Sequence, residues 1–335
     1  MRQMSAVNAL VAHQDAEGEI TLGHEIVDDR YLPEGDVTIS VEYSGVNYKD
    51  ALAVTPKGGV ARSYPLIPGI DVAGTVAASS SPEFAVGDRV FAHGYDIGTG
   101  RHGGYADTAR YPADYLVKID GLTTADAAAI GTAGFTAAMS VNAIRAHGVR
   151  PQDGPVLVTG GTGGVGSTSV DLLAGLGYEV VASTGKEEAH DYLMGLGATE
   201  VIGRLPEAGE KVRPLGKSKW AAVLDSVGGD TLAYALSTLN YGGIAAISGL
   251  ARSADLPTTV MPFILRGITL AGIDSVQLAI ELRREIWKQL EGELKPKHLA
   301  DITTDISVLE TPHTLRAIIG GGVIGRTRVV VHDGF

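Results

Sequence analysis

An apolar run that stops in glycine constrains the fold of this chain more than any other segment. Residues 156–159 have the composition of a short buried strand. Five of the next seven residues are glycines (Gly160, Gly161, Gly163, Gly164 and Gly166), and Val165 stands among them. Gly161, Gly163 and Gly166 match G-x-G-x-x-G, a pattern that permits a tight turn, close approach of a pyrophosphate to the backbone, and close packing of a helix on a strand. A helix over about 165–176 and a strand over 178–183 complete a βαβ unit. The pattern predicts a dinucleotide-binding turn that offers backbone N–H groups to a pyrophosphate; a glycine turn without ligand is the alternative.

The end of the second strand indicates which dinucleotide to expect. NAD-preferring sites carry an acidic residue there, which holds the ribose 2′-hydroxyl. This chain has Ser183, Thr184, Gly185 and Lys186 instead. Two hydroxyls and an ammonium can hold a 2′-phosphate, so the sequence predicts NADPH. The alternative is a polar turn with a solvated lysine.

Charge and composition exclude several classes of protein. The formal net charge of −12 argues against nucleic acid and anionic membranes as partners. The absence of cysteine excludes disulfides, a thiol nucleophile and a thiolate metal site. Residues 127–144 carry no charge, but their small and polar side chains favour a buried helix over a membrane span. No signal-peptide pattern opens the sequence, and we expect a cytoplasmic protein.

The order of the expected elements divides the chain into two domains. The first 126 residues are rich in strands, expected at 37–43, 69–76, 88–92 and 105–111. After residue 127, strands at 200–202, 221–226, 243–248 and 268–273 alternate with helices at 187–196 and 231–239. A helix at 276–292 and a strand at 325–331 follow. The alternation predicts an α/β fold, in which a Rossmann-type doubly wound parallel sheet (127–274) is inserted in a β-rich domain (1–126 plus 275–335).

Five further strings carry a resemblance to a known family. They are LPEGDV at 32–37, NYKDALA at 47–53, IPGIDVAGTV at 67–76, GTAGFTA at 131–137 and TVMPFILR at 259–266. With this domain order they resemble the medium-chain dehydrogenase/reductase superfamily, and within it the zinc-free acrylyl-CoA reductase group, whose members are often labelled quinone oxidoreductases. The resemblance implies a GroES-like catalytic domain, NADPH as cofactor, a short α,β-unsaturated acyl-CoA as substrate, and a homodimer.

The zinc-binding members of that superfamily differ from this chain at the metal ligands. Asn47 stands where the first cysteine ligand would be, and Gly69-Ile70-Asp71 replaces Gly-His-Glu, so that Ile70 cannot ligate. The string Gly23-His24-Glu25 lies too far upstream to substitute, and we interpret His24 as a surface residue. We expect neither zinc nor any other metal.

An alcohol dehydrogenase needs a Lewis acid to lower the alcohol pKa. Without one, hydride attack on a C=C bond conjugated to a carbonyl is the more natural chemistry, with donors that stabilise the developing oxyanion. Asn47, Tyr48 and Asp50 occupy the segment that would have faced the metal. The resemblance places Tyr48 near the nicotinamide, either as a donor to the substrate oxygen or as a wall against the ring. We expect Asp50 to fix the loop and Lys49 to be solvated.

Other candidate contacts come from the resemblance and from strand ends. The resemblance places Thr136 in the nicotinamide pocket; its alternative role is a hydroxyl that bonds back to a helix carbonyl. Gly249, Leu250 and Ser275 follow parallel strands at their carboxyl ends, where ligands bind in open α/β sheets, and we expect backbone contacts to the nicotinamide half.

Arg326 begins the last strand and is expected in the catalytic site, on the 2′-phosphate, the nicotinamide amide or a CoA phosphate; a surface arginine is the alternative. Arg62 and Arg101 are weaker candidates for CoA contacts. The sequence thus favours an NADPH-dependent reductase of a short unsaturated acyl-CoA. An NADPH:quinone oxidoreductase and an NADPH-binding structural or regulatory protein without turnover remain alternatives. Homodimer formation is expected through the apolar segment 259–273.

Overall fold

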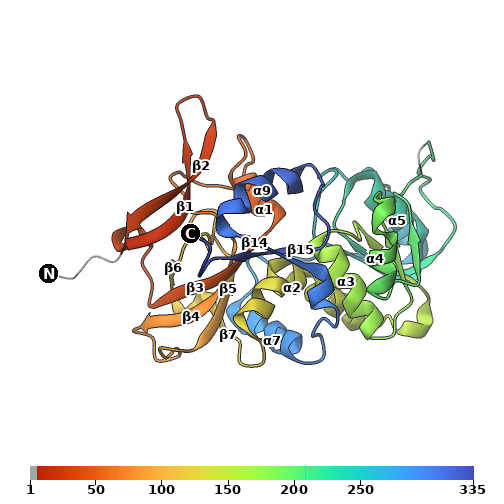
Figure 1. Ribbon diagram of the computed structural model, residues 1–335. Helices are drawn as coiled ribbons and strands as arrows, with labels where there is room; N and C mark the ends of the chain where they lie inside the picture. The colour runs from red at the N-terminus through yellow and green to blue at the C-terminus, as the bar shows by residue number, and fades with distance from the viewer. Residues whose placement is uncertain (1–5, 208) are drawn as a thin grey trace. The chain divides into compact units, whose positions relative to one another are not determined.

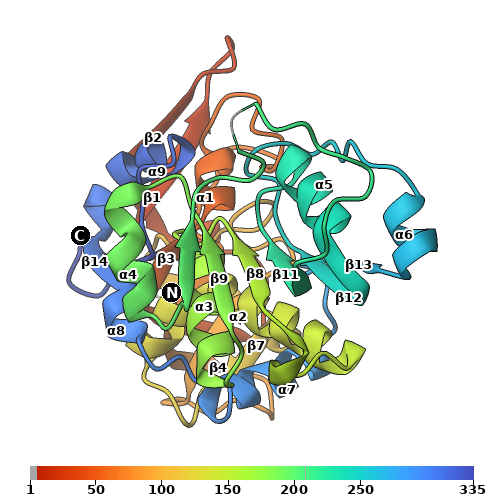
Figure 2. The same cartoon turned by 90° about the vertical axis from the view of Figure 1, so that its right-hand side faces the viewer.

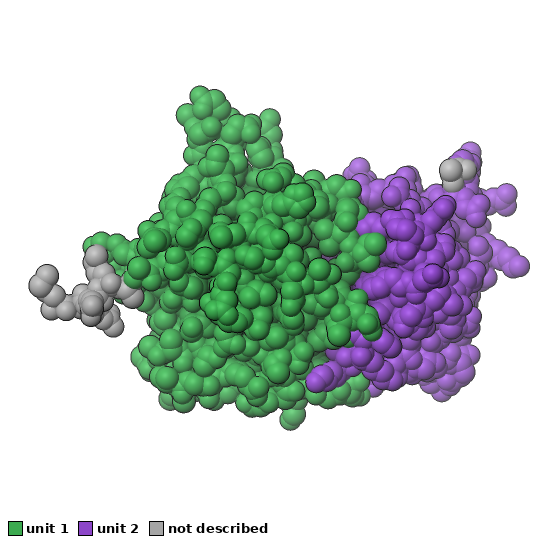
Figure 3. Space-filling model, in the orientation of Figure 1, with its two compact units in different colours: residues 1–132, 275–293, 299–335 green, residues 133–274, 294–298 purple. Residues whose placement is uncertain are grey.

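The computed structural model describes residues 6–207 and 209–335. Figure 1 and Figure 2 show the chain from two sides, and Figure 3 distinguishes two compact units. The first unit contains the described residues up to 132 together with 275–293 and 299–335, and the second contains 133–274 and 294–298. The first division falls inside helix α2 (Thr124–His147), next to a kink at Gly131, whose φ of 54° combined with a ψ of −166° only glycine adopts readily. The expected boundary was at 127, within the first turn of this helix.

The first unit is built on a mixed sheet. Its strand order is β14-β15-β3-β4-β5-β7, with β6 paired to β3, and β1 and β2 form a separate antiparallel pair. The strands are β1 (Ala6–Gln14), β2 (Ile20–Asp28), β3 (Val37–Val46), β4 (Asp71–Ser79), β5 (Arg89–His93), β6 (Thr108–Tyr111), β7 (Leu116–Lys118), β14 (Thr303–Ser307) and β15 (Arg326–Val330).

Strand β3 organises this sheet because its apolar side chains alternate. Val37, Ile39 and Val41 are buried in the core, as period-two alternation predicts. The strand pairs antiparallel with both β4 and β15, and Val46 lies opposite Thr327 of β15. This register brings the last strand of the chain beside the segment that enters α1, and so positions Arg326 near Asn47.

The helices of the first unit are short apart from α7. They are α1 (Tyr48–Ala53), α7 (Ile280–Glu291), α8 (Leu299–Ile302) and α9 (Thr311–Ile319), with 3-10 turns at Asp29–Tyr31, Ala113–Tyr115 and Val308–Glu310. The helix expected at 276–292 begins only at Ile280. The residues just before it are not helical, and Arg283 donates to the carbonyls of Ser275, Val276 and Leu278.

The second unit confirms the predicted doubly wound parallel sheet. Its strands are β8 (Val156–Thr159), β9 (Val180–Ser183), β10 (Glu200–Ile202), β11 (Trp220–Asp225), β12 (Leu239–Ile247) and β13 (Thr269–Gly272), in the order β10-β9-β8-β11-β12-β13. Neighbouring strands in this order are parallel throughout. The chain moves outward from β8 to β10 and then returns to β11, so the topological switch point, where such sheets bind ligands, lies between β8 and β11.

Helices connect these strands. They are α3 (Gly164–Gly175), α4 (His190–Gly195), α5 (Gly229–Thr238) and α6 (Met261–Arg266), with 3-10 turns at Pro151–Asp153 and Glu187–Ala189. Figure 2 shows β9, β8, β11, β12 and β13 side by side. The strand predicted at 105–111 is shorter in the structure, because only residues 108–111 pair with β3.

Helix α2 is long and apolar enough to cross a membrane by composition. However, 78% of its most apolar window is buried inside the protein. The kink at Gly131 also interrupts its helical backbone. It is a core helix, as its small side chains indicated.

Candidate active site and cofactor site

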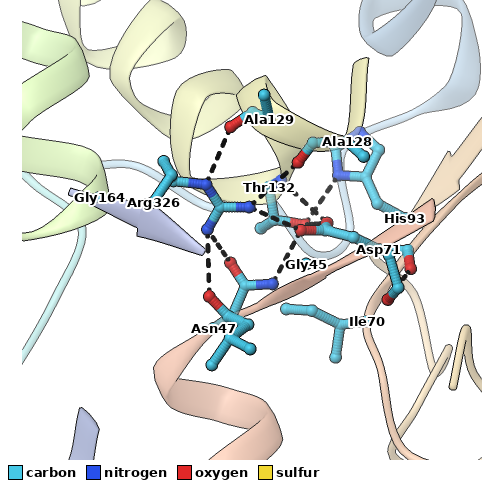
Figure 4. A network of polar contacts seen from close by, with 12 residues as sticks. Gly45, Asn47, Ile70, Asp71, His93, Ala128, Ala129, Thr132, Gly164 and Arg326 are labelled. Atoms are coloured by element: carbon cyan, nitrogen blue, oxygen red, sulfur yellow. Dashed lines mark hydrogen bonds and ion pairs between the residues drawn. The ribbon is translucent and has the colours of Figure 1, made fainter. Parts of the chain in front are cut away.

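A buried carboxylate, Asp71, is the centre of a polar network in the first unit (Figure 4). Its side chain is fully buried at the start of β4. One oxygen accepts from the backbone N–H and the hydroxyl of Thr132, at 2.9 and 2.6 Å. The other accepts from Asn47 Nδ2 at 2.8 Å and from Arg326 Nη2 at 3.1 Å. Four donors therefore satisfy the carboxylate, which is what a buried charge requires.

Arg326 completes the ion pair of this network. It is 2% exposed, and it also donates to Asn47 Oδ1 at 2.9 Å, Val46 O at 3.2 Å and Ala129 O at 3.0 Å. A Cβ built on Gly131 would collide with its guanidinium, so the kink in α2 and the arginine depend on each other. These partners do not fit the expectation that Arg326 contacts a phosphate or the nicotinamide amide. Its guanidinium is engaged within the first unit, as that of a positioning residue would be, and a ligand contact of Arg326 stays a prediction.

The network holds the segment that carries Tyr48. Asn47 uses both side-chain polar atoms on Asp71 and Arg326, and its backbone N–H donates to Asp50 Oδ2 at 2.8 Å. Asp50 Oδ1 accepts from Ile70 N at 2.8 Å. The Asp50 side chain thus joins the start of α1 to the segment before β4, as its expected loop-fixing role requires. Burial and the nearby Asp71 charge raise the pKa of Asp50 to about 7.

Tyr48 is the first residue of α1 and remains 39% exposed. Its backbone is fixed on both sides by Asn47 and Asp50, while its ring can still meet a ligand. Asn47, in contrast, is 8% exposed and fully engaged. The structure therefore separates the two predicted catalytic neighbours: Tyr48 is accessible, and Asn47 orients the loop.

A second layer supports Asp71 from helix α7. Trp287 Nε1 donates to His93 Nε2 at 2.9 Å, which leaves the proton of the neutral imidazole on Nδ1, 3.2 Å from Thr132 Oγ1. Burial and the charge of Arg283 hold the pKa of His93 well below its usual value, so this ring is neutral. A hydrogen-bonded chain thus runs from Trp287 through His93 and Thr132 to Asp71.

Sequence reasoning missed this chain of contacts. At the metal position, the segment Gly69-Ile70-Asp71 was interpreted from the ligand that it lacks, and the acid at its third position was overlooked. His93 and Trp287 are separated by 194 residues, and no local pattern joins them.

In the second unit, the glycine turn between β8 and α3 leaves an open space beside its middle glycine, which the packing of the fold does not fill. A Cβ on Gly166 would collide with the carbonyl of Gly160, so the packing of α3 on the turn requires this glycine. A Cβ on Gly163 would lie 3.4 Å from Gly160 O, an ordinary contact, and its φ of −77° suits any residue. The middle glycine thus leaves open the space where the motif predicts a pyrophosphate. This turn fits a dinucleotide.

The residues predicted to bind the 2′-phosphate follow one another at the carboxyl end of β9, and they differ in how far their polar groups are already hydrogen-bonded. Ser183 Oγ donates to Gly203 O at 2.8 Å, so its proton is already used. Thr184 Oγ1 accepts from Lys186 N at 3.1 Å and lies 3.4 Å from Thr162 Oγ1. Burial, opposed by the Glu188 charge, lowers the pKa of Lys186. Ser183 is therefore the weakest of the three as a donor to a phosphate.

Arg204 is a further cation at this edge that the sequence reasoning missed. It is exposed, follows β10, and lies so close to Gly185 that a Cβ there would collide with its guanidinium. Lys186 and Arg204 thus flank the ends of two adjacent parallel strands. The signal was present in the sequence only as a basic residue after the next strand, beyond the segment where specificity is usually sought.

The other predicted cofactor residues occupy the following places. Thr136 is buried in α2, and its carbonyl accepts from Ser140 Oγ at 2.9 Å. Gly249 and Leu250 follow β12 at its carboxyl end, and Leu250 is 58% exposed. The carbonyl of Ser275, at the start of the returning segment of the first unit, accepts from Arg283 Nη2 at 3.2 Å. Contacts of these residues with a cofactor stay predictions.

The residues at the superfamily's metal position do not form a ligand set. Ile70 presents an apolar, buried side chain, and Asn47 is engaged with Asp71 and Arg326. Across residues 6–207 and 209–335, no three His, Cys, Asp or Glu side chains gather as metal ligands would. His24 lies exposed on β2 and contacts Asn8 Oδ1 at 3.2 Å. That the protein works without zinc stays a prediction.

Comparison with known proteins adds full-length relatives. Residues 33–121 match the family "Alcohol dehydrogenase GroES-like domain", and residues 164–292 match "Zinc-binding dehydrogenase". The acrylyl-CoA reductase AcuI of Ruegeria pomeroyi is 45% identical over 97% of this chain and 99% of its own length.

Two solved structures are similarly close. YhdH of E. coli K-12 with bound NADPH is 47% identical, with a TM-score of 0.93 over 96% of this chain and 99% of that one. The yhfP protein of Bacillus subtilis with NAD bound is 44% identical, with a TM-score of 0.94 over 97% and 99%. Similarity at this level over nearly the whole length, together with the two domain matches, shows the family. The chain belongs to the medium-chain dehydrogenase/reductase superfamily, and its relatives there include the acrylyl-CoA reductase AcuI and the proteins YhdH and YhfP.

Proposed function

We propose that the protein is an NADPH-dependent reductase that saturates the C=C bond of a short α,β-unsaturated acyl-CoA, converting acrylyl-CoA to propionyl-CoA. The observation that carries the substrate assignment is the full-length similarity to the acrylyl-CoA reductase of Ruegeria pomeroyi. The chemistry of the first unit supports it, because an apolar Ile70 and an engaged Asn47 replace the superfamily's metal ligands.

The second unit supplies the residues that would hold the cofactor. The turn of Gly161, Gly163, Gly164, Val165 and Gly166 would bind the pyrophosphate through backbone N–H groups at the start of α3. Lys186 and Arg204, with the hydroxyl of Thr184, would bind the 2′-phosphate. Gly249, Leu250 and Thr136 would contact the nicotinamide half. When bound, NADPH supplies the hydride for the β-carbon of the substrate.

The first unit would stabilise the charge that this addition creates. Negative charge develops on the thioester oxygen of the resulting enolate, and the accessible Tyr48 hydroxyl would donate a hydrogen bond to it. A proton, delivered in the end from solvent, would then add to the α-carbon and complete the saturated product. Asn47, Asp71 and Arg326 would not touch the substrate; they would hold the backbone of Tyr48 in one place. Such positioning matters because a misplacement of about 1 Å can cost about 100-fold in rate.

The test compares three substrates with one purified protein. NADPH oxidation is followed with acrylyl-CoA, crotonyl-CoA and a benzoquinone, in the wild type and in Tyr48→Phe. We expect turnover of acrylyl-CoA and a lower kcat in Tyr48→Phe with little change in the KM for NADPH. Turnover of the quinone alone would identify a quinone oxidoreductase, and cofactor binding without any turnover would identify a structural or regulatory protein; either outcome would overturn the proposal.

We further propose a cytoplasmic homodimer formed through the second unit. Strand β13 is at the edge of its sheet, and the adjoining helix α6 exposes apolar side chains. Val260, Ile264 and Leu265 are 67%, 72% and 55% exposed. An unpaired edge next to an apolar patch is a typical site of self-association. Sedimentation equilibrium that gives only the monomer mass would contradict this.

A further inference from the structure

Two adjoining cavities in the first unit have no role in the function proposed so far. One, of about 280 Å³, is open to solvent and lies between the loop after α1 and the β1–β2 hairpin; Lys57, Arg62 and Ser63 belong to its lining. The other, of about 460 Å³, shares Ser63 with the first. Tyr31, Pro65 and His102 are among its walls.

The smaller cavity is cationic in an otherwise acidic protein. Its lining includes Lys57 and Arg62 and no carboxylate, while the whole chain carries a net charge of −12. Two acids, Glu34 and Asp96, line the neighbouring cavity together with Arg101. Asp96 lies 3.8 Å from Arg62 and 3.5 Å from Arg101. Arg62 is 66% exposed, so its guanidinium can turn toward a ligand. Local cations of this kind are what a phosphorylated ligand needs.

The loop that carries these cations is held in place. Tyr64 Oη donates to Ala53 O at 2.7 Å, and Arg62 N donates to Thr99 O at 2.8 Å. Lys57 adopts a φ of 60°, a conformation that few residue types accept. The cavity is thus a built feature of the loop.

The smaller cavity lies near the end of α1 that is opposite Tyr48. Helix α1 begins at Tyr48 and ends at Ala53, whose carbonyl accepts the hydrogen bond from Tyr64. At 1.5 Å per residue, the length of this helix is about 8 Å. The extended pantetheine arm of an acyl-CoA exceeds this length. A thioester near Tyr48 would therefore leave the phosphates of the same molecule within reach of Lys57 and Arg62.

We propose that the two cavities bind the 3′-phosphoadenosine diphosphate end of the acyl-CoA. Its phosphates contact Lys57 and Arg62 in the smaller cavity, and its adenine lies in the larger one. The wall there includes the stacked rings of Tyr31 and His102, whose centroids are 4.6 Å apart. This assignment rests on the proposed function, because it takes an acyl-CoA as the substrate.

The experiment compares acrylyl-CoA with acrylyl-pantetheine, which has the same reacting group and no nucleotide. The variants are Arg62→Ala, Lys57→Asn, chosen because asparagine tolerates a positive φ, and the double variant. Arg150→Ala is the matched control: Arg150 is 70% exposed and lies 3.8 Å from Asp153, outside both cavities.

The double variant is expected to raise the KM for acrylyl-CoA about tenfold with kcat unchanged, because the contacts bind ground state and transition state alike. The KM for acrylyl-pantetheine should not move, and the control should change neither constant. If the wild type uses both thioesters with equal KM, or if the double variant leaves the KM for acrylyl-CoA unchanged, the nucleotide site is wrong while the reductase activity stands.

Calorimetry with free CoA separates the two proposals, because it needs no turnover. Wild-type binding that the double variant loses would support the site even if no thioester is reduced, in which case the proposed function fails alone. A protein that binds CoA as tightly after both substitutions would refute the site whatever the activity.

Discussion

Replacing Asp71 by asparagine should expose how much the buried network contributes. The carboxylate accepts four hydrogen bonds: two from Thr132, one from Asn47 and one from Arg326. An amide offers only one acceptor atom, so in either orientation its NH₂ group faces donors. Arg326, 2% exposed, also loses its buried counter-ion.

The expected cost follows from the burial of the pair. Removing one partner of a buried ion pair costs about 3–5 kcal/mol. For a domain of this size, each kcal/mol lowers Tm by about 2–4 °C, so Asp71→Asn should lower Tm by about 6–20 °C. The matched control is Asp305→Asn. Asp305 is the exposed ion-pair partner of Arg328, which lies on β15 as Arg326 does. An exposed pair contributes about 0–1 kcal/mol, so this control should shift Tm by no more than about 4 °C.

Thermal unfolding followed by circular dichroism measures both variants, and steady-state kinetics with acrylyl-CoA accompany it. We expect kcat of Asp71→Asn to fall about 10- to 100-fold, because Asn47 no longer holds the start of α1. Asp71→Asn with Arg326→Gln removes both charges and should be less destabilised than the sum of the single variants. Equal effects of Asp71→Asn and Asp305→Asn, or strict additivity in the double variant, would refute the reasoning.

Three other predictions address the cofactor turn, its specificity and the buried acid. Gly163→Ala should weaken NADPH binding about tenfold with an unchanged Tm, whereas Gly166→Ala should lower Tm, since only the latter Cβ collides with the fold; equal Tm losses would contradict this. Lys186→Ala and Arg204→Ala should each raise the KM for NADPH about tenfold and leave that for NADH within about twofold; parallel increases would remove them from the 2′-phosphate site. The pKa of Asp50 is raised from 3.8 to about 7, so its stabilising contribution is complete at low pH and is lost as pH rises toward 7. In urea titrations, the stability of the wild type relative to Asp50→Asn should therefore fall by about 2 kcal/mol between about pH 5 and pH 7, and a pH-independent difference would show that Asp50 stays ionised.

The sequence predicts the second unit well because its information is local. Glycine spacing, apolar runs and their alternation with helices specify β8, α3 and β9 within about 30 residues, and the parallel order follows from connection rules. Element boundaries are less predictable where tertiary contacts decide them. Helix α7 starts at Ile280 because the side chain of Arg283 holds the preceding carbonyls.

The site of the first unit could be predicted only in part. The segment 47–50 was identified from its position in the family pattern, and the sequence suggested the loop-fixing role of Asp50. The buried partners of Arg326 could not be predicted, because they are 197 to 280 residues away in the chain. No periodicity or motif reports that Asp71, Thr132 and Arg326 meet; only the register of β15 on β3 brings them together.

The most direct test of the central claim follows the hydride itself. The purified protein is incubated with acrylyl-CoA and NADPH that carries deuterium at both positions of ring carbon 4, and the product is analysed by mass spectrometry and NMR. We predict propionyl-CoA with a single deuterium on the β-carbon. No propionyl-CoA, or a product whose β-carbon carries no deuterium, would contradict the account.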